Sequence, residues 1–436
     1  MILLAILFWI VSLYIILDTH KLFKNKLLKW VISICLSASI LSFSFSIHLF
    51  LGIDFLVYQI LITIIPSIYC IFQFRNIKII LKREADKKPT LSNWELILIL
   101  SCFLIFSALF FLKSTRWGSW DAWAIWSLHA KFLVFEDQFI NLFTNNISWT
   151  HPDYPLMLPS IIASIWKSLN TTSPMVPLFV SYLTTAGLPL LVLGSFLELQ
   201  LKKIGLICYI IFCLGIFLHL FGSLQYADTL LSLFVLIPFV LINHIDKEKP
   251  LLLILIGFFA ATSVWIKNEG FLFFIVFSVF FAFSHLKNIK YYVLFLMGAL
   301  VPLLITLYFK GVYAPINDLV NESSVSTLNK VTEFDRYKTI CGYFLVSVVF
   351  KNPLVFILLI SALILDYKYA FTFVFKVVAV IIVAYFLVYI VTPKDLDWHL
   401  KTSIDRLFHH ISPLLIYSVF IYFGKKHKII SFKKVT

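Results

Sequence analysis

Charge is scarce in this chain. Only 13% of its 436 residues are charged, whereas 61% are hydrophobic. A typical soluble domain has about a quarter of its residues charged and about half apolar. These proportions exclude an ordinary soluble domain and indicate an integral membrane protein.

The sequence also lacks the signals of a processed or cross-linked secreted protein. Residues 1–17 have neither a basic start nor a small-residue cleavage site, which favours a retained membrane span over a signal peptide. The six cysteines fall in apolar runs without metal-ligand spacing, so we expect buried thiols and no disulfide framework. No internal repeat is visible.

Long apolar runs recur along the whole length, and each is a candidate helical span. They predict an all-α polytopic membrane protein with about thirteen transmembrane helices and additional interfacial helices on the outer face. Residues 1–92 are expected to form a three-span addition to a core of residues 93–436. The runs are 1–17, 30–50, 55–73, 93–112, 174–197, 204–221, 229–243, 251–266, 270–284, 291–309, 353–365, 375–391 and 407–423.

The distribution of lysine and arginine predicts the orientation. When the N-terminus is placed outside, the cytoplasmic loops and the C-terminal tail carry 23 of the 36 basic residues, although the outer loops are longer. This is the positive-inside pattern. The net charge of +14 is therefore a topology signal, with contact to lipids of the inner leaflet as a second effect, and nucleic-acid binding is not expected.

The polar motifs all fall on the predicted outer face, where loops 113–173, 310–340 and 392–406 are expected to be the catalytic loops. Five clusters from separate loops favour one composite site on that face. Loop 310–340 is long enough to be a lid or simply a connector. The motifs are WDAW at 120–123, HPDYP at 151–155, QYAD at 225–228, WIKNEG at 265–270 and TPKDLDWHLKTSIDR at 392–406.

The first outer motif places an acid among tryptophans directly after a span. Ser119 can start a helix there, with Asp121 in its first turn, and on a regular α-helix His129 and Lys131 would flank the Asp121 face. Asp121 could merely stabilise the helix start, but a lone acid in a bulky aromatic segment favours function. The tryptophans themselves are typical of a membrane-interface belt.

The remaining motifs supply further candidates for substrate binding, and each candidate could instead have a purely structural role. The prolines of HPDYPLMLP forbid a regular helix until near residue 160 and hold the turn rigid, which serves either packing or substrate contact. The acid of QYAD could simply stabilise a helix start, the charges of WIKNEG could pair with each other, and the acids after TPK could be solvated in a loop. An arginine entering an apolar run is expected to have an anionic partner. The candidates are His151, Asp153, Asp228, Lys267, Glu269, Asp397, His399 and Arg406.

Taken in order, WDAWAIW, HPDYPLMLP, YADTLL, KNEG and TPKDLDWHLKTSIDRL resemble the multi-spanning membrane glycosyltransferases of the GT-C superfamily, of the bacterial family 39-like type. The resemblance covers roughly residues 93–423. It implies a polyprenyl-phosphate-linked sugar as donor, no nucleotide cofactor, and a catalytic base at Asp121. WDAW stands where relatives often have an Asp-Glu pair followed by tyrosine, so metal use and the acceptor (glycan, lipid or protein) are left open.

Transfer from a lipid phosphate needs a base for the acceptor hydroxyl and cations for the departing phosphate. Asp121 suits the first role, and Lys131, Lys267 and Arg406 suit the second. The expected location is the bacterial cytoplasmic membrane, with the C-terminus in the cytoplasm. A transporter or flippase of polyprenyl-linked saccharides is the alternative from another class, and an outer-face polysaccharide polymerase or ligase is the third. A transporter should carry ionisable groups near mid-membrane on broken helices, whereas these groups gather at the predicted outer ends.

Overall fold

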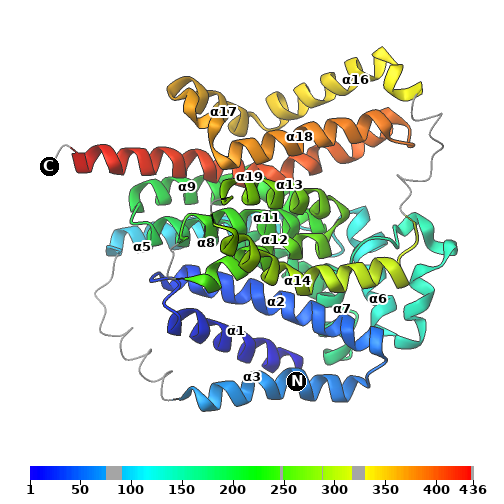
Figure 1. Ribbon diagram of the computed structural model, residues 1–436. Helices are drawn as coiled ribbons and strands as arrows, with labels where there is room; N and C mark the ends of the chain where they lie inside the picture. Colours follow the sequence, from blue (N-terminus) through cyan, green and yellow to red (C-terminus); the bar gives the residue numbers. More distant parts are fainter. Residues whose placement is uncertain (75–90, 246–248, 287, 317–328, 434–436) are drawn as a thin grey trace. The chain divides into compact units, whose positions relative to one another are not determined.

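The protein is an all-α, multi-pass membrane protein in the computed structural model (Figure 1). The structure describes residues 1–74, 91–245, 249–286, 288–316 and 329–433, and no β-strand occurs in these ranges. The central part of the predicted loop 310–340, residues 317–328, lies outside the described residues, so its expected role as lid or connector stays a prediction.

Among the described residues, eight helices are long and apolar enough to cross a membrane, or nine if the bent pair Phe334–Lys351 and Pro353–Leu365 forms one span. Four shorter apolar helices accompany them. The predicted count of thirteen is therefore not confirmed. One predicted span is interrupted: the run 204–221 divides at Gly215, where the backbone turns extended between two helices.

The chain divides into two compact units. The first consists of residues 1–150, 156–227 and 247–252, and the second of residues 151–155, 228–246 and 253–436. These units cut across the predicted boundary at residue 93. The predicted boundary marks where the family resemblance begins and makes no statement about compact units, so it stays a prediction.

The first unit packs its N-terminal helices side by side, as α1, α2 and α3 show in Figure 1. Local caps set several helix starts: Asn25 accepts from the Leu28 amide, and Ser92 with Glu95 forms a capping box. The elements are α1 (Ile2–Thr19), α2 (Lys26–Leu51), α3 (Phe55–Phe72), α5 (Asn93–Lys113), η1 (Ala122–Ser127), α6 (Leu128–Val134), η2 (Glu136–Phe143), η3 (Asn145–Thr150), α7 (Met157–Leu169), α8 (Met175–Glu198), α9 (Lys202–Leu214) and α10 (Ile216–Ser223).

The segment that follows α5 is helical as expected, but its geometry differs from a regular α-helix. Residues 122–127 form a π-helix directly after Asp121, so the angles of a regular α-helix do not carry over to the residues that follow. His129 is fully buried and its Nε2 lies 3.2 Å from Thr150 Oγ1, so the expectation that it sits at the surface beside Asp121 is wrong. Lys131 is exposed, and Trp120, Trp123 and Trp149 form a half-exposed cluster.

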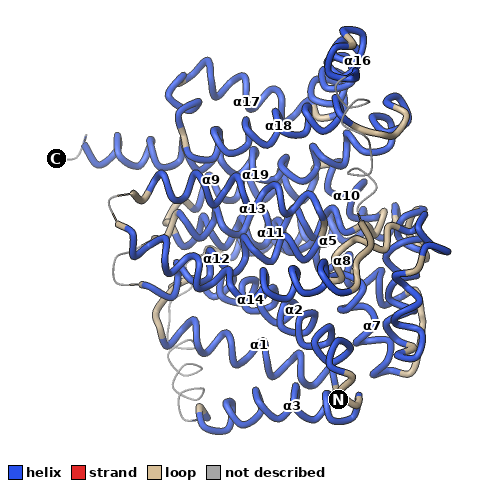
Figure 2. Tube along the Cα trace, turned by 45° about the vertical axis from the view of Figure 1, so that its right-hand side comes forward, coloured by secondary structure: helices blue, strands red, loops and turns tan. Residues whose placement is uncertain are grey.

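The second unit, apart from the short segment 151–155, is built from the C-terminal helices, whose course Figure 2 traces. Here α18 packs on α19, and α17 packs on α19 as well. The elements are α11 (Ala227–Ile242), α12 (Pro250–Ile266), α13 (Asn268–Ser284), α14 (Ile289–Val312), α16 (Phe334–Leu345), η5 (Val346–Lys351), α17 (Pro353–Leu365), η6 (Tyr367–Phe371), α18 (Phe373–Val391) and α19 (Leu396–Lys433).

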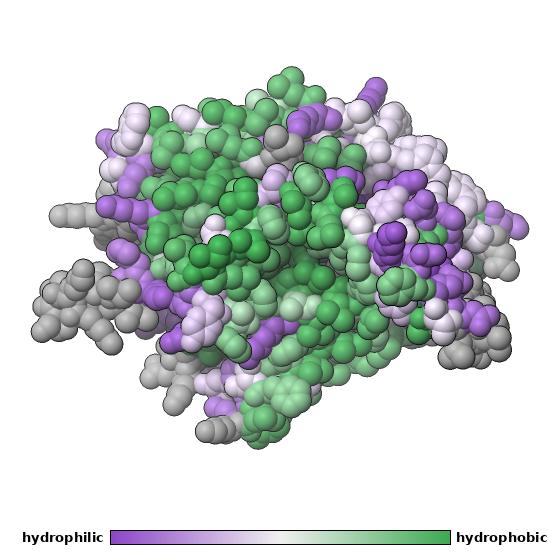
Figure 3. Space-filling view, turned by 90° about the horizontal axis from the view of Figure 1, so that it is seen from above, coloured by the Kyte–Doolittle hydropathy of each residue, from purple (hydrophilic) through white to green (hydrophobic). Residues whose placement is uncertain are grey.

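Apolar side chains face outward over wide areas, as expected for a protein whose solvent is lipid. Figure 3 shows one face on which hydrophobic residues gather in a broad area, with hydrophilic residues towards its margins. Exposed large hydrophobic side chains such as Leu112 and Ile364 occur along the candidate spans. In a soluble protein such surfaces would drive aggregation, whereas in a bilayer they contact acyl chains.

Candidate functional site

The WIKNEG motif forms a one-residue break between two helices. Helix α12 ends at Ile266, Lys267 is extended with φ −154° and ψ 160°, and α13 begins at Asn268. The break is a single residue long, because α13 begins two residues before Gly270. Gly270 permits this, since a Cβ built there would lie 1.9 Å from the Ser263 carbonyl oxygen. The break thus presents Lys267, Asn268 and Glu269 together at the start of α13.

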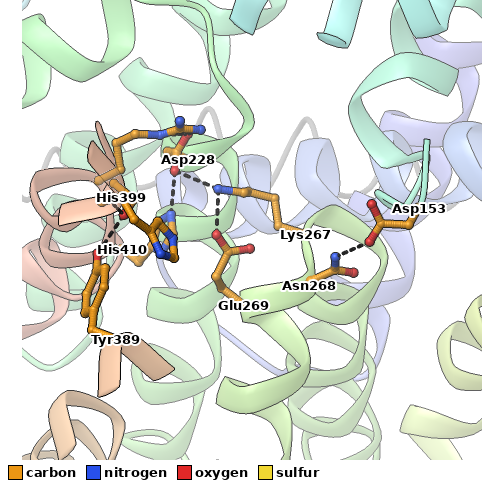
Figure 4. A network of polar contacts seen from close by, with 10 residues as sticks. Asp153, Asp228, Lys267, Asn268, Glu269, Tyr389, His399 and His410 are labelled. Atoms are coloured by element: carbon orange, nitrogen blue, oxygen red, sulfur yellow. Dashed lines mark hydrogen bonds and ion pairs between the residues drawn. The ribbon is translucent and has the colours of Figure 1, made fainter. Parts of the chain in front are cut away.

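Asp228, in the first turn of α11, is the centre of a buried ionic network (Figure 4). Its Oδ1 accepts from Lys267 Nζ at 3.0 Å and from His410 Nε2 at 2.7 Å. Its Oδ2 accepts from Arg406 Nε at 3.2 Å and from Nη2 at 3.0 Å. The Asp228 side chain is 0% exposed and that of Lys267 2%. A buried carboxylate with four N–H donors is well compensated for its lost hydration.

Lys267 connects this network to Glu269. Its Nζ lies 2.9 Å from Glu269 Oε1, so the local ion pair that the sequence offered as a structural role does form. Glu269 Oε2 is buried and has no hydrogen-bond partner in the described part of the chain. One oxygen of this carboxylate is therefore held by protein, and the other keeps its capacity to accept a hydrogen bond.

A second network of hydrogen-bonded side chains lies beside the first and includes Asp153 of the HPDYP turn. Asn268 Nδ2 donates to Asp153 Oδ2 at 2.8 Å, and Lys310 Nζ donates to Asn268 Oδ1 at 2.8 Å. Lys310 also donates to the backbone carbonyl of Asp153. In the same turn the rings of His151 and Tyr154 stack with centroids 5.0 Å apart. The prolines thus hold these residues in a fixed loop, although α7 begins at Met157, three residues earlier than expected.

The turn between α18 and α19 contributes a third set of polar contacts. Thr392 Oγ1 lies 2.8 Å from His399 Nδ1, and Tyr389 donates or accepts a hydrogen bond with Ser403 Oγ at 2.7 Å. Arg336 of α16 donates to the carbonyl oxygens of Ile390 and Tyr389 at the end of α18. These contacts satisfy carbonyl groups that a helix leaves open at its C-terminus.

A cavity of about 290 Å³ lies among these groups in the second unit. That volume is close to the lower end of the usual range for small-molecule sites, about 300 Å³. Three cationic side chains line it: Lys267 directly before α13, Lys394 in the turn before α19, and Arg406 within α19. Apolar side chains complete the wall, among them Leu272, Val388 and Leu407. The cavity can therefore receive a molecule that joins an anionic group to an apolar part.

Six of the sequence-predicted residues line this cavity: His151, Asp153, Lys267, Glu269, His399 and Arg406. Asp228 does not line it but forms ion pairs with Lys267 and Arg406, which do. Asp397 also does not line it; its side chain is 58% exposed and lies 3.8 Å from Lys401. Asp121 and Lys131 belong to the first unit, and their share in the site stays a prediction.

Several residues of the site were missed from the sequence. His410 lies inside an apolar run, where an ionisable side chain could have served as a signal for a buried partner. Lys310 follows an apolar run and resembles an ordinary interfacial lysine. Asn268 lies in the KNEG motif between the candidates Lys267 and Glu269, but it carries no charge and was passed over for that reason.

The structure contains no group of three or more His, Cys, Asp or Glu side chains suited to hold a metal ion, within the residues it describes. The D-x-D spacing of Asp395 and Asp397 is explained locally, because Asp395 Oδ1 caps the start of α19 by accepting from the Trp398 amide at 2.8 Å. The described residues of the site supply fixed cations, one carboxylate oxygen without a hydrogen-bond partner, and several hydroxyl groups.

Comparison with known proteins gives no relative: no protein-family model, no curated protein and no solved structure matches the chain.

Proposed function

We propose that this protein is a glycosyltransferase that moves a sugar from a polyprenyl-phosphate donor to a glycan, lipid or protein acceptor. The proposal places the reaction at the outer face of a bacterial cytoplasmic membrane, with the N-terminus outside and the C-terminus in the cytoplasm. It builds on the resemblance to GT-C transferases in the ordered motifs and on the basic-residue distribution.

One observation carries the proposal: the cavity combines three cationic side chains with an apolar wall in a membrane protein. A polyprenyl-phosphate sugar has matching parts, namely a phosphodiester and a hydrocarbon chain. Charge-assisted hydrogen bonds from Lys267, Lys394 and Arg406 would hold the phosphate. The hydroxyl groups of Thr402, Ser403 and Tyr389 line the cavity; each already makes a hydrogen bond within the protein, and their oxygens can accept further ones from the polar sugar.

The proposed step is a single displacement. A base takes the proton of the acceptor hydroxyl, the acceptor oxygen bonds to the anomeric carbon, and the bond from that carbon to the phosphate oxygen breaks. The polyprenyl phosphate leaves with the electron pair, and the cations stabilise its charge. We assign Asp121 as the base, because it is the acid that the family resemblance selects.

The test uses purified protein in nanodiscs, incubated with radiolabelled polyprenyl-phosphate sugars and membrane extract, followed by identification of the labelled product. Asp121→Asn should insert normally and lose transfer, whereas Asp137→Asn, which changes an exposed acid of the same outer segment, should retain it. Transfer by Asp121→Asn at the wild-type rate would remove Asp121 as base.

Donor binding is measured separately from turnover. Arg406→Ala should weaken binding of the polyprenyl-phosphate sugar, and an unchanged affinity would remove Arg406 from the donor site. If the wild-type protein binds the donor and carries it across the bilayer but forms no labelled product, the transporter alternative replaces the transferase.

A further inference from the structure

A second cavity, a groove of about 560 Å³, lies along α16 in the second unit. One stripe of α16 and η5 lines it, with residues spaced three or four apart, so that they share a helix face. The stripe consists of Asp335, Lys338, Thr339, Gly342, Tyr343 and Val346. Ile404 of α19 contributes to the lining as well.

The floor of the groove is open at Gly342. A Cβ built on this glycine would meet no atom within 4 Å. Most interior glycines of this protein behave differently, since a Cβ at Gly270 would collide with backbone. Gly342 is exposed, so this helix face has no side chain at that position to fill the groove.

The charges at the polar end of the groove are one of each sign. Lys351, which also lines it, is already paired with Asp405 at 2.7 Å. Asp335 and Lys338 are exposed, and neither has an ion-pair partner among the residues that the structure describes. They lie one helical turn apart. The groove thus offers a carboxylate and an ammonium together, with no excess of either charge.

Beyond Asp335 and Lys338, and before Lys351, the same element carries apolar side chains. Val346 continues the stripe, and next to it Leu345 is 63% exposed and Phe350 75% exposed. From residue 335 to residue 350 the element extends about 22 Å at the rise of a helix. The apolar part of the element thus lies between the charged residues Asp335 and Lys338 at one end and the Lys351–Asp405 ion pair at the other.

We propose that this groove binds a zwitterionic phospholipid with a primary ammonium, of the phosphatidylethanolamine type. The lipid phosphate accepts hydrogen bonds from Lys338, and the lipid ammonium donates to Asp335. An acyl chain lies along Val346 towards Phe350. An anionic lipid is less well matched because Asp335 would repel it, and a quaternary ammonium has no N–H to donate. The site is separate from the proposed transferase cavity and does not depend on that function.

The test measures which lipids stay bound to the full-length protein. The protein is reconstituted in nanodiscs with equal amounts of phosphatidylethanolamine, phosphatidylcholine and phosphatidylglycerol, and retained lipids are identified by native mass spectrometry. Phosphatidylethanolamine should be retained over each competitor by about tenfold, the ratio that one well-placed charged hydrogen bond gives. Equal retention of the three lipids would overturn the proposal.

Three variants locate the bound lipid. Lys338→Gln should abolish the preference, and Asp335→Asn should shift it towards phosphatidylglycerol because the cation then stands alone. Gly342→Leu should displace the lipid by filling the floor. Lys401→Gln, which removes an exposed cation of α19, serves as the control and should change nothing. An unchanged preference in both charge variants would refute the site, even if Gly342→Leu failed to fold.

Discussion

Neutralising Asp228 should be among the most damaging single changes in the second unit. In Asp228→Asn the side chain keeps its shape but loses its charge, and one oxygen becomes an NH2 group. If that group replaces Oδ2, it faces the two Arg406 donors; if it replaces Oδ1, it faces Lys267 and His410. In either orientation, two N–H groups that now bond to the carboxylate meet a donor in place of an acceptor.

The expected loss follows from burial. Asp228 is 0% exposed and Lys267 2%, so water cannot replace the missing acceptor. Removing one partner of a buried ion pair costs about 3–5 kcal/mol of unfolding free energy. Asp397→Asn is the matched control, because Asp397 is 58% exposed and its partner lies 3.8 Å away. An exposed pair of that kind contributes about 0–1 kcal/mol.

Unfolding in mixed micelles with increasing denaturing detergent gives the free energy for each variant. A double-mutant cycle with Arg406→Gln isolates the Asp228–Arg406 contact, and a coupling energy of about 1–3 kcal/mol is expected. If Asp228→Asn cost no more than Asp397→Asn, the carboxylate would not be the centre of the network, and the reasoning from burial would fail.

Three further predictions concern positions outside that network. Gly270→Ala should cost about 3 kcal/mol or more in the same assay, because its Cβ would lie 1.9 Å from a carbonyl oxygen, whereas Gly311→Ala, with open space, should be tolerated. Hydrogen bonds from Lys426 and then Tyr422 lower the pKa of Asp366 from 3.8 to about 2. The stabilisation that ionised Asp366 contributes is therefore complete above about pH 4 and lost as the pH falls towards 2. Asp366→Asn should consequently destabilise the protein at pH 5 but not at pH 2, as followed by thermal unfolding. Arg336→Gln should weaken donor binding to the 290 Å³ cavity by loosening the end of α18, and unchanged affinity by titration calorimetry would contradict this.

The spans that the sequence predicted best are those whose apolar run and helix signals agree. The run 93–112 corresponds to α5, Asn93–Lys113, because Ser92 and Glu95 form a capping box at its start. The run 375–391 corresponds to α18, Phe373–Val391, with Thr372 as cap. In both cases the ends of the apolar run and of the helix differ by at most two residues, so the sequence pattern alone is sufficient to locate the helix.

The helix that carries the last apolar run is longer than that run. The apolar run 407–423 starts after Arg406, yet α19 begins at Leu396. A hydropathy pattern treats a charged residue as the end of a membrane helix. Here Arg406 and His410 remain in the helix because Asp228, far away in sequence, satisfies them. The ion pairs of Arg406 and His410 with Asp228 are tertiary contacts, which cannot be seen in a single sequence.

The site was predictable in its residues more than in their roles. Charged side chains next to apolar runs identified Lys267, Glu269 and Arg406, which line the cavity. The same rule could not distinguish Asp228, which supports the cations, from Asp397, which faces solvent. Both are acids near the start of a helix, and burial alone separates them.

The positions of the two buried acids follow from the helices that carry them. Asp228 lies in the first turn of α11 and Glu269 in the first turn of α13, where exposed amides and the helix dipole favour negative charge. Lys267 contacts both carboxylates, so these two helix starts converge on one cation. An incoming phosphate would meet the same helix ends and the same cations, in competition with the acids already bound there. Because Asp228 is fully enclosed and Glu269 borders the cavity, Glu269 is the acid that such a ligand would displace from Lys267.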